Sequence, residues 1–534
     1  MRLLLQFRFL PLTLSVLFAL SSLAAAIAWP VWTFFFACAF VGFAMLVALG
    51  LRDITQTRHA VLRNYPIAAH LRFLLESVRP EMRQYFFEGE KDGAPFPRDK
   101  RAIVYQRAKK ELDKRPFGTM FDVYQEQYEW LHHSLAPTAP LPVDQMRVQV
   151  GSYSASLLNI SAMSYGALSA NAIRSLNKGA KAGGFFHDTG EGGVSPYHRE
   201  HGGDLVWEIG SGYFGCRAAD GGFDPAKFAE NAADPQIKMI EVKLSQGAKP
   251  GHGGVLPAAK VTAEISAIRG VPMGQDCVSP ARHAAFSTPI DLMHFIAQLR
   301  DLSGGKPTGF KLCIGHEWEF MALCKAMVET GITPDFIVID GKEGGTGAAP
   351  LEFMDHIGMP LRDGLSFAHN ALVGAGLRDR VKLGASGKIT SAFDMAKVMA
   401  LGADWCNAAR GFMFAVGCIQ AQSCHTGECP TGVATQDPLR QRALVVGDKA
   451  ERVKNFHHNT LHALSELVAA AGLTHPGELR PHHFQRRASS DKVISFAEQY
   501  EQLAPGILLQ NPAASSRYGA AWSLAQSGSF ARTA

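Results

Sequence analysis

The sequence lacks several features that would assign it to a simple class of protein. Its 534 residues include 53 basic and 48 acidic side chains, and a net charge of +5 is too small to indicate a nucleic-acid-binding surface. Nine cysteines in a chain of this length do not form a disulfide scaffold. The 52 glycines have no triplet period, which excludes collagen. Hydrophobic residues make up 47% of the chain, which excludes disorder for most of it.

Charge is also nearly absent from residues 9–51, an apolar run long enough for two membrane-spanning helices. Pro30 interrupts helical structure, and the flanking Trp29 and Trp32 favour a membrane–water interface. Basic residues lie outside both ends of the run, namely Arg2, Arg8, Arg52, Arg58 and Arg63.

By the positive-inside rule both ends of this run face the cytosol. Residues 1–52 are therefore predicted to form a transmembrane helical hairpin in the inner (cytoplasmic) membrane, with the catalytic domain cytosolic. A signal peptide cleaved near Ala24–Ala26 is the alternative, but a second apolar run follows it at once.

Beyond a helical lead-in at residues 53–150, short apolar runs alternate with amphipathic stretches of helical length. The predicted strands are 157–163, 183–188, 238–244, 309–314, 335–340, 381–385 and 404–408. The predicted helices are 168–182, 260–269, 289–302, 316–330, 366–376, 391–401 and 449–471. This alternation predicts an α/β fold, a closed (β/α)8 TIM barrel over residues 151–480. Residues 481–534 are predicted to form a helical extension and a tail that is frayed after about residue 505.

Three cysteines lie close together in GCIQAQSCHTGECP: Cys418, Cys424 and Cys429. Thiolates are soft ligands, and this spacing, with proline after the last cysteine, is typical of an iron–sulfur cluster. Zinc with His425 as fourth ligand is an alternative, although adjacent Cys424 and His425 would crowd a tetrahedral site. Structural thiols without metal are the other alternative.

Four glycine-rich or small-residue turns follow predicted strands: Thr189–Gly193, Gly344–Gly347, Ser386–Lys388 and Asn407–Arg410. Backbone N–H groups in such turns can bind phosphate, although glycine also serves ordinary tight turns. In barrel enzymes the loops after the seventh and eighth strands often form a phosphate site. The last two turns occupy that position, so a phosphorylated cofactor is predicted.

Two lysines, Lys243 and Lys311, interrupt apolar strands. A strand lysine usually extends to solvent, but at the mouth of a barrel it can stabilise a flavin anion or an acidic substrate. Lys249 and Arg269 can add a clamp for a carboxylate.

In these motifs the chain resembles the FMN-binding synthase domain of glutamate synthase. The matching segments are SAMSYGALS (161–169), DTGEGG (188–193), EVKLSQGAKPGHGG (241–254), GKEGGTGAAP (341–350) and CIQAQSCHTGECPTGVATQDP (418–438). The resemblance implies a barrel that holds FMN and a 3Fe-4S cluster. It also implies an oxidoreductase of the class acting on CH–NH2 donors, which reduces 2-iminoglutarate, made from 2-oxoglutarate and ammonia, to L-glutamate.

The resemblance also implies roles for individual residues. The cluster ligands would be Cys418, Cys424 and Cys429, and the catalytic residues that hold the oxo acid would be Glu191, Lys249 and Arg269. The flavin ring would contact Ser161, Ala162, Met163 and Lys311, and Lys243 is a further predicted cofactor-binding residue. The FMN and its phosphate would be lined by Gly344, Gly345, Thr346, Gly347, Ser386, Gly387, Ala408, Ala409 and Arg410.

The implied partners are an oxo acid or amino acid substrate, an electron donor such as ferredoxin or a reductase subunit, and a separate glutaminase as an optional nitrogen source. We expect neither the N-terminal amidotransferase domain nor the C-terminal glycine-repeat domain of the large enzymes. Where the family motif AKPGxGGQLP has glutamine, this chain has Val255, which removes a polar contact to the oxo acid. Two alternatives therefore stay open: a flavin enzyme that acts on another amino or hydroxy acid and passes electrons to the membrane pool, and a non-catalytic redox partner protein.

Overall fold

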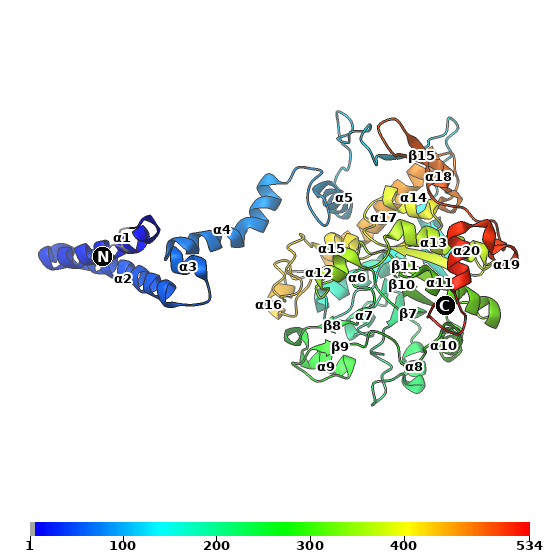
Figure 1. The fold of residues 1–534 in the computed structure, drawn as a ribbon, viewed down its shortest axis with the longest axis horizontal. Helices are drawn as coiled ribbons and strands as arrows, with labels where there is room; N and C mark the ends of the chain where they lie inside the picture. Colours follow the sequence, from blue (N-terminus) through cyan, green and yellow to red (C-terminus); the bar gives the residue numbers. More distant parts are fainter. Residues whose placement is uncertain (1–5, 534) are drawn as a thin grey trace. The chain divides into compact units, whose positions relative to one another are not determined.

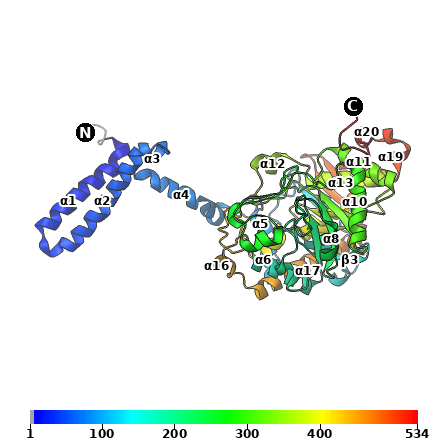
Figure 2. The same ribbon diagram turned by 90° about the horizontal axis from the view of Figure 1, so that it is seen from below.

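The computed structural model describes residues 6–533 and divides into two compact units, Met1–Gly93 and Ala94–Ala534. The first unit is helical (Figure 1): it contains α1 (Leu10–Ala28), α2 (Thr33–Thr55), α3 (Ala60–Asn64) and α4 (Ala68–Met82). Helices α1 and α2 lie side by side (Figure 2) and are joined by the short turn Pro30–Trp32, which confirms the predicted break at Pro30. Both are long and apolar enough to cross a membrane. Of the flanking arginines, Arg2 lies outside the described residues.

The first unit leaves much apolar surface uncovered. Phe34 is 85% exposed and Val31 is 91% exposed, whereas few side chains of α1 and α2 are buried. At the other end of the hairpin the buried carboxylate of Asp53 accepts from the backbone N–H of Ile67 at 2.9 Å and contacts His70 Nε2 at 3.0 Å. The loop after α2 is thus fixed by one buried acid.

Eight parallel strands close into a barrel in the second unit, which confirms the predicted fold class. In spatial order they are β10 (Thr308–Leu312), β11 (Phe336–Asp340), β12 (Lys382–Ser386), β13 (Trp405–Ala408), β4 (Leu158–Ile160), β5 (His187–Asp188), β6 (Leu205–Ile209) and β7 (Ile237–Lys243). The apolar strand β6, LVWEI, was not among the predicted strands. The strand predicted at 183–188 is only β5, because the preceding helix runs to Gly183 and ends on the left-handed Gly184.

Helices cover the outside of the barrel as predicted. They include α6 (Ala170–Gly183), α8 (Pro225–Ala232), α10 (Pro289–Leu302), α11 (Glu317–Thr330), α13 (Leu361–Gly374), α14 (Ala392–Ala400), α15 (Arg410–Val416) and α17 (Val446–Ala470). The helix predicted at 260–269 is α9 (Ala263–Arg269), but it belongs to an excursion between β7 and β10. That excursion also contains the hairpin of β8 (Val255–Leu256) and β9 (Cys277–Val278).

Segments on either side of the barrel sequence differ from expectation. The lead-in contains α5 (Arg98–Lys109) but also β1 (Glu129–Leu131) and the hairpin of β2 (Arg147–Val150) and β3 (Tyr153–Ser156). Strand β1 pairs with β14 (Phe484–Arg487), which no local pattern reveals. The expected frayed tail is wrong: α20 (Ser516–Leu524) packs on the barrel, with Tyr518 1% exposed and stacked on Phe367 at 5.2 Å.

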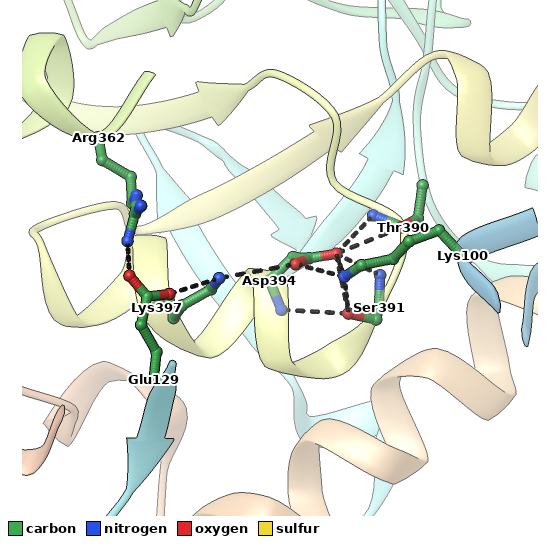
Figure 3. A network of polar contacts seen from close by, with 7 residues as sticks. All are labelled: Lys100, Glu129, Arg362, Thr390, Ser391, Asp394 and Lys397. Atoms are coloured by element: carbon green, nitrogen blue, oxygen red, sulfur yellow. Dashed lines mark hydrogen bonds and ion pairs between the residues drawn. The ribbon is translucent and has the colours of Figure 1, made fainter. Parts of the chain in front are cut away.

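A partly buried ion network attaches the lead-in to the barrel helices (Figure 3). Lys100 of α5 contacts Asp394 of α14 at 2.8 Å. Glu129 of β1 lies between Lys397, at 3.0 Å, and Arg362. Asp394 also accepts from the backbone N–H of Ser391 and so completes the capping box of α14. The network therefore links the lead-in to barrel helices that lie more than two hundred residues further along the chain.

We expect Asp394→Asn to lower the free energy of unfolding by about 2 kcal/mol at pH 7. Burial alone would raise the pKa of Asp394, but Lys100 and Lys397 outweigh it and hold the pKa at about 2. A carboxyl whose pKa is depressed on folding stabilises the protein above its unfolded pKa. The difference in the free energy of unfolding between variant and wild type should thus be largest at pH 7 and vanish as the pH falls from about 4 to 2. Chemical denaturation in detergent measures it.

Asp291→Asn is the matched control, because Asp291 completes the capping box of α10 in the same way and has no lysine or arginine partner within the described residues. This substitution should lower the free energy of unfolding by about 1 kcal/mol or less. Equal losses in the two variants would show that the cap, and not the lysines, provides the stabilisation.

Candidate functional site

A cavity of about 1170 Å³ opens at the carboxyl ends of the barrel strands. This is the end at which barrel enzymes place their active sites. The cavity is lined by every predicted site residue except Cys429: Ser161, Ala162, Met163, Glu191, Lys243, Lys249, Arg269, Lys311, Gly344, Gly345, Thr346, Gly347, Ser386, Gly387, Ala408, Ala409, Arg410, Cys418 and Cys424. Its volume exceeds that of a typical small-molecule pocket, so it has room for more than one ligand.

The turn Thr189–Gly193 fits between its neighbours only because glycine stands at Gly190 and Gly192. Gly190 has a φ of +64°, and a Cβ there would lie 2.7 Å from the backbone N of Ser164. A Cβ on Gly192 would lie 2.8 Å from a guanidinium nitrogen of Arg269. The close approach of these segments directs Glu191 into the cavity.

Glu191 pairs with Lys243 at the end of β7. The carboxylate oxygen and the ammonium nitrogen lie 2.8 Å apart. Burial would raise the pKa of Glu191, but Lys243, Arg269 and Lys249 together lower it. Glu191 is therefore ionised at neutral pH and surrounded by three cations. Of these, Lys243 is the direct partner, which sequence reasoning assigned instead to the cofactor.

Arg269 ends α9 and is held in place by its neighbours. It donates to the carbonyl oxygen of Tyr165 at 3.2 Å, and its guanidinium lies 5.1 Å from the ring centre of Phe214. The side chain is buried, and its Nε finds no hydrogen-bond partner among the described residues. Arg269 thus has a buried donor without a protein partner and lines the cavity.

Lys249 is the most unusual residue of the site. It is 2% exposed, and its ammonium has no hydrogen-bond partner in the part of the chain that the structure describes. Burial lowers its pKa, whereas Glu191 raises it. A buried cation without a partner is costly, so Lys249 and Arg269 together fit a bound carboxylate.

Small residues line another wall of the cavity. Ser161, after β4, and Ser386, at the end of β12, place their hydroxyl oxygens 3.3 Å apart. Arg410 reaches across the mouth and donates to the carbonyl oxygen of Gly345 at 3.1 Å. A Cβ on Gly347 would lie 3.2 Å from the backbone of Cys424, so the turn Gly344–Gly347 lies directly against the cysteine segment. These loops form a concave surface rich in backbone groups, as a phosphate site requires.

A charged cluster occupies the barrel interior below this wall. Lys311 of β10 forms ion pairs with Glu208 of β6 and, at 3.0 Å, with Glu241 of β7. Among residues 6–533, the only three potential metal ligands whose atoms lie within 4.8 Å of one another are Asp188, Glu208 and Glu241. The ammonium of Lys311 already bridges two of them, so we assign no ion to the cluster. Sequence reasoning missed Glu208 because it missed β6.

The cysteine segment begins after α15. Cys418 and Cys429 are buried, whereas Cys424 is partly exposed. Burial raises the pKa of Cys418, and the neighbouring Cys424 and Cys429 add to the rise, so the three thiols interact electrostatically. The sulfurs are not all within 4.8 Å of one another, as sulfurs about 3.8 Å apart around one zinc ion would be. The three described thiols therefore do not form a tetrahedral zinc site in this structure.

Comparisons with known proteins show which proteins this chain is similar to. Residues 118–474 match the conserved region in glutamate synthase. The glutamate synthase large subunit-like protein YerD of Bacillus subtilis is 37% identical over 83% of this chain and 93% of its own length. The archaeal glutamate synthase [NADPH] of Methanocaldococcus jannaschii is 38% identical over 60% of each chain. This chain thus spans well under two thirds of the archaeal relative. Among solved structures, a flavocytochrome b2 variant with pyruvate bound matches at a TM-score of 0.42 and 11% identity over 87% of this chain and 95% of that chain.

Proposed function

The chain belongs to the glutamate synthase family, and we propose that it is an FMN- and iron–sulfur-dependent oxidoreductase that reduces 2-iminoglutarate, formed from 2-oxoglutarate and ammonia, to L-glutamate. The observation that carries this proposal is the buried, unpartnered ammonium of Lys249, a residue that lines the cavity together with Arg269. A dicarboxylic oxo acid supplies the anionic groups that these cations need.

The described residues fit both cofactors. The loops after β11, β12 and β13 and the guanidinium of Arg410 would hold the FMN phosphate, and Ser161, Ala162 and Met163 would border the ring. Cys418, Cys424 and Cys429 would hold a 3Fe-4S cluster next to the turn Gly344–Gly347. When bound, the flavin supplies hydride chemistry and the cluster supplies one-electron transfer.

The protein's own part in the reaction is binding and orientation. Lys249 and Arg269 would hold the acid so that its imino carbon faces the flavin ring. Glu191, kept ionised by Lys243, would orient the imine nitrogen and hold its proton there by accepting a hydrogen bond. Overall, the imine takes up a hydride and a proton to become the amine.

The test is anaerobic purification of the full chain in detergent, followed by flavin and iron analysis. Glutamate formation is then assayed from 2-oxoglutarate and ammonium with reduced ferredoxin or a chemical electron donor. We expect stoichiometric FMN, three irons per chain and glutamate that depends on both substrates. A colourless chain without iron would refute the cofactors, and a loaded chain that forms no glutamate would refute the substrate.

A second candidate function rests on Val255, which lines the cavity where a polar contact to the oxo acid is expected. In this alternative the enzyme acts on another amino or hydroxy acid and passes electrons to the membrane pool. Quinone reduction that depends on such an acid, and not on glutamate, would favour it.

We also propose that α1 and α2 anchor the chain in the cytoplasmic membrane with the barrel in the cytosol. Resistance to alkaline extraction from membranes tests the anchor.

A further inference from the structure

Lys260 is a buried lysine that the proposed reaction does not use. It ends a single helical turn, Ala258–Lys260, directly after β8 in the excursion that carries Val255 and Arg269. The side chain is 5% exposed and lines the cavity. Its ammonium donates to the carbonyl oxygen of Cys424 at 2.6 Å. The excursion therefore places one cation against the cysteine segment, 164 residues further along the chain.

The charge of Lys260 has no carboxylate partner in the described part of the chain, where none lies within 4.0 Å of its ammonium. Burial lowers the pKa of Lys260, and the groups that raise it are Cys424 and Cys429. The groups that favour the charge of this buried lysine are therefore two of the three predicted cluster ligands. A neutral hydrogen-bond donor would be enough to satisfy one carbonyl oxygen, so the charge calls for a second explanation.

An iron–sulfur cluster on three thiolates is anionic, and its reduction adds a further negative charge. Net charge, hydrogen bonds and solvent exposure near a cluster set its reduction potential. A fixed cation that is shielded from water stabilises the reduced state more than the oxidised state. A lysine so placed favours the arrival of an electron from the external donor.

We propose that Lys260 is a positioning residue that raises the reduction potential of the cluster held by Cys418, Cys424 and Cys429. The inference rests on the cluster in the proposed function and adds to it the element that tunes the cluster. It also joins the two halves of the site, because the segment that binds the acid through Arg269 supplies the cation beside the cysteines.

The test compares Lys260→Gln with Lys260→Arg in the full chain purified anaerobically. Glutamine can still donate to the Cys424 carbonyl but has no charge, whereas arginine keeps the charge. Iron and sulfide are quantified, and the cluster is titrated electrochemically by electron paramagnetic resonance. We expect full iron in both variants and, for Lys260→Gln alone, a reduction equilibrium about tenfold less favourable, which corresponds to about 59 mV for one electron.

Lys325→Gln is the matched control, because Lys325 is also partly buried and donates to a backbone carbonyl, that of Ala525 at 2.9 Å, and does not line the cavity. It should leave the potential unchanged. An unchanged potential in a fully loaded Lys260→Gln variant would overturn the inference and leave the proposed function intact. Loss of iron from both Lys260 variants would also overturn the inference, because it would show that Lys260 is needed to shape the cysteine segment. A wild-type chain without iron would instead refute the cluster itself, and the inference with it.

Discussion

Replacing Lys311 with methionine should lower the free energy of unfolding by about 3–5 kcal/mol, the usual cost of breaking a buried ion pair by removing one partner. Lys311 is 3% exposed and is bonded to Glu208 and Glu241 inside the barrel. Without the ammonium, two buried carboxyl groups lose their counter-charge. Asp188 adds a third carboxyl within 4.8 Å.

The loss of stability in Lys311→Met should depend on pH. In the wild type, burial opposes the charge of Lys311, but Glu208 and Glu241 outweigh it and raise its pKa well above the ordinary value. Once the lysine is removed, the carboxyl groups have raised pKa values in the folded state and are most stable when protonated. The variant's stability is then greatest below the ordinary pKa of a carboxyl group and falls as the pH rises through the raised values. The penalty should therefore be larger at pH 8 than at pH 5.5.

Lys238→Met is the control for this prediction. Lys238 lies on the neighbouring strand β7, but its ion pair with Asp204 at 3.8 Å is partly exposed. Such pairs contribute little, so the loss should stay below about 1 kcal/mol. Chemical denaturation of the detergent-solubilised chains measures both variants. If Lys311→Met were no more destabilising than Lys238→Met, the interior cluster would not be a significant source of stability.

Replacing Lys249 with methionine should reduce kcat/KM for 2-oxoglutarate by about 100-fold or more, because a buried charged contact to the acid is lost. The same substitution should leave the stability of the substrate-free protein unchanged or raise it. The reason is that the ammonium of Lys249 is buried with no hydrogen-bond partner among residues 6–533, and methionine removes that desolvation cost. Opposite effects on stability and turnover are expected of a group that is placed for a ligand.

Lys325→Met is the matched control, because burial also lowers the pKa of Lys325 and its ammonium has a protein partner. It should lower stability and leave kcat/KM within about threefold. Lys249→Arg should recover part of the activity, since it keeps the charge but changes the reach. A Lys249→Met chain that loses stability and retains its kcat/KM would show that Lys249 is a structural residue.

Much of the fold follows from local pattern, and the exceptions have physical causes. Strands β7, β10, β11 and β13 appear where apolar runs predict them, and α10 has the predicted bounds. Strand β6, LVWEI, was not predicted although it is an apolar run buried at every position, as β10 is. Strands β1 and β14 were not predicted because they pair with each other across more than three hundred residues of sequence.

Local sequence patterns were enough to predict most of the residues that gather at the barrel mouth. The glycine turns and the cysteine segment follow successive parallel strands, and such strands all end at one edge of the barrel, so their loops must meet. The partners of the charged side chains became known only from the folded chain. Lys311 pairs with Glu208, and Lys243 pairs with Glu191. Lys260 donates to the backbone of Cys424, and Lys249 has no hydrogen-bond partner in the described chain. Partners of a buried charge come from strands and excursions distant in sequence, and burial itself exists only once those segments have packed together.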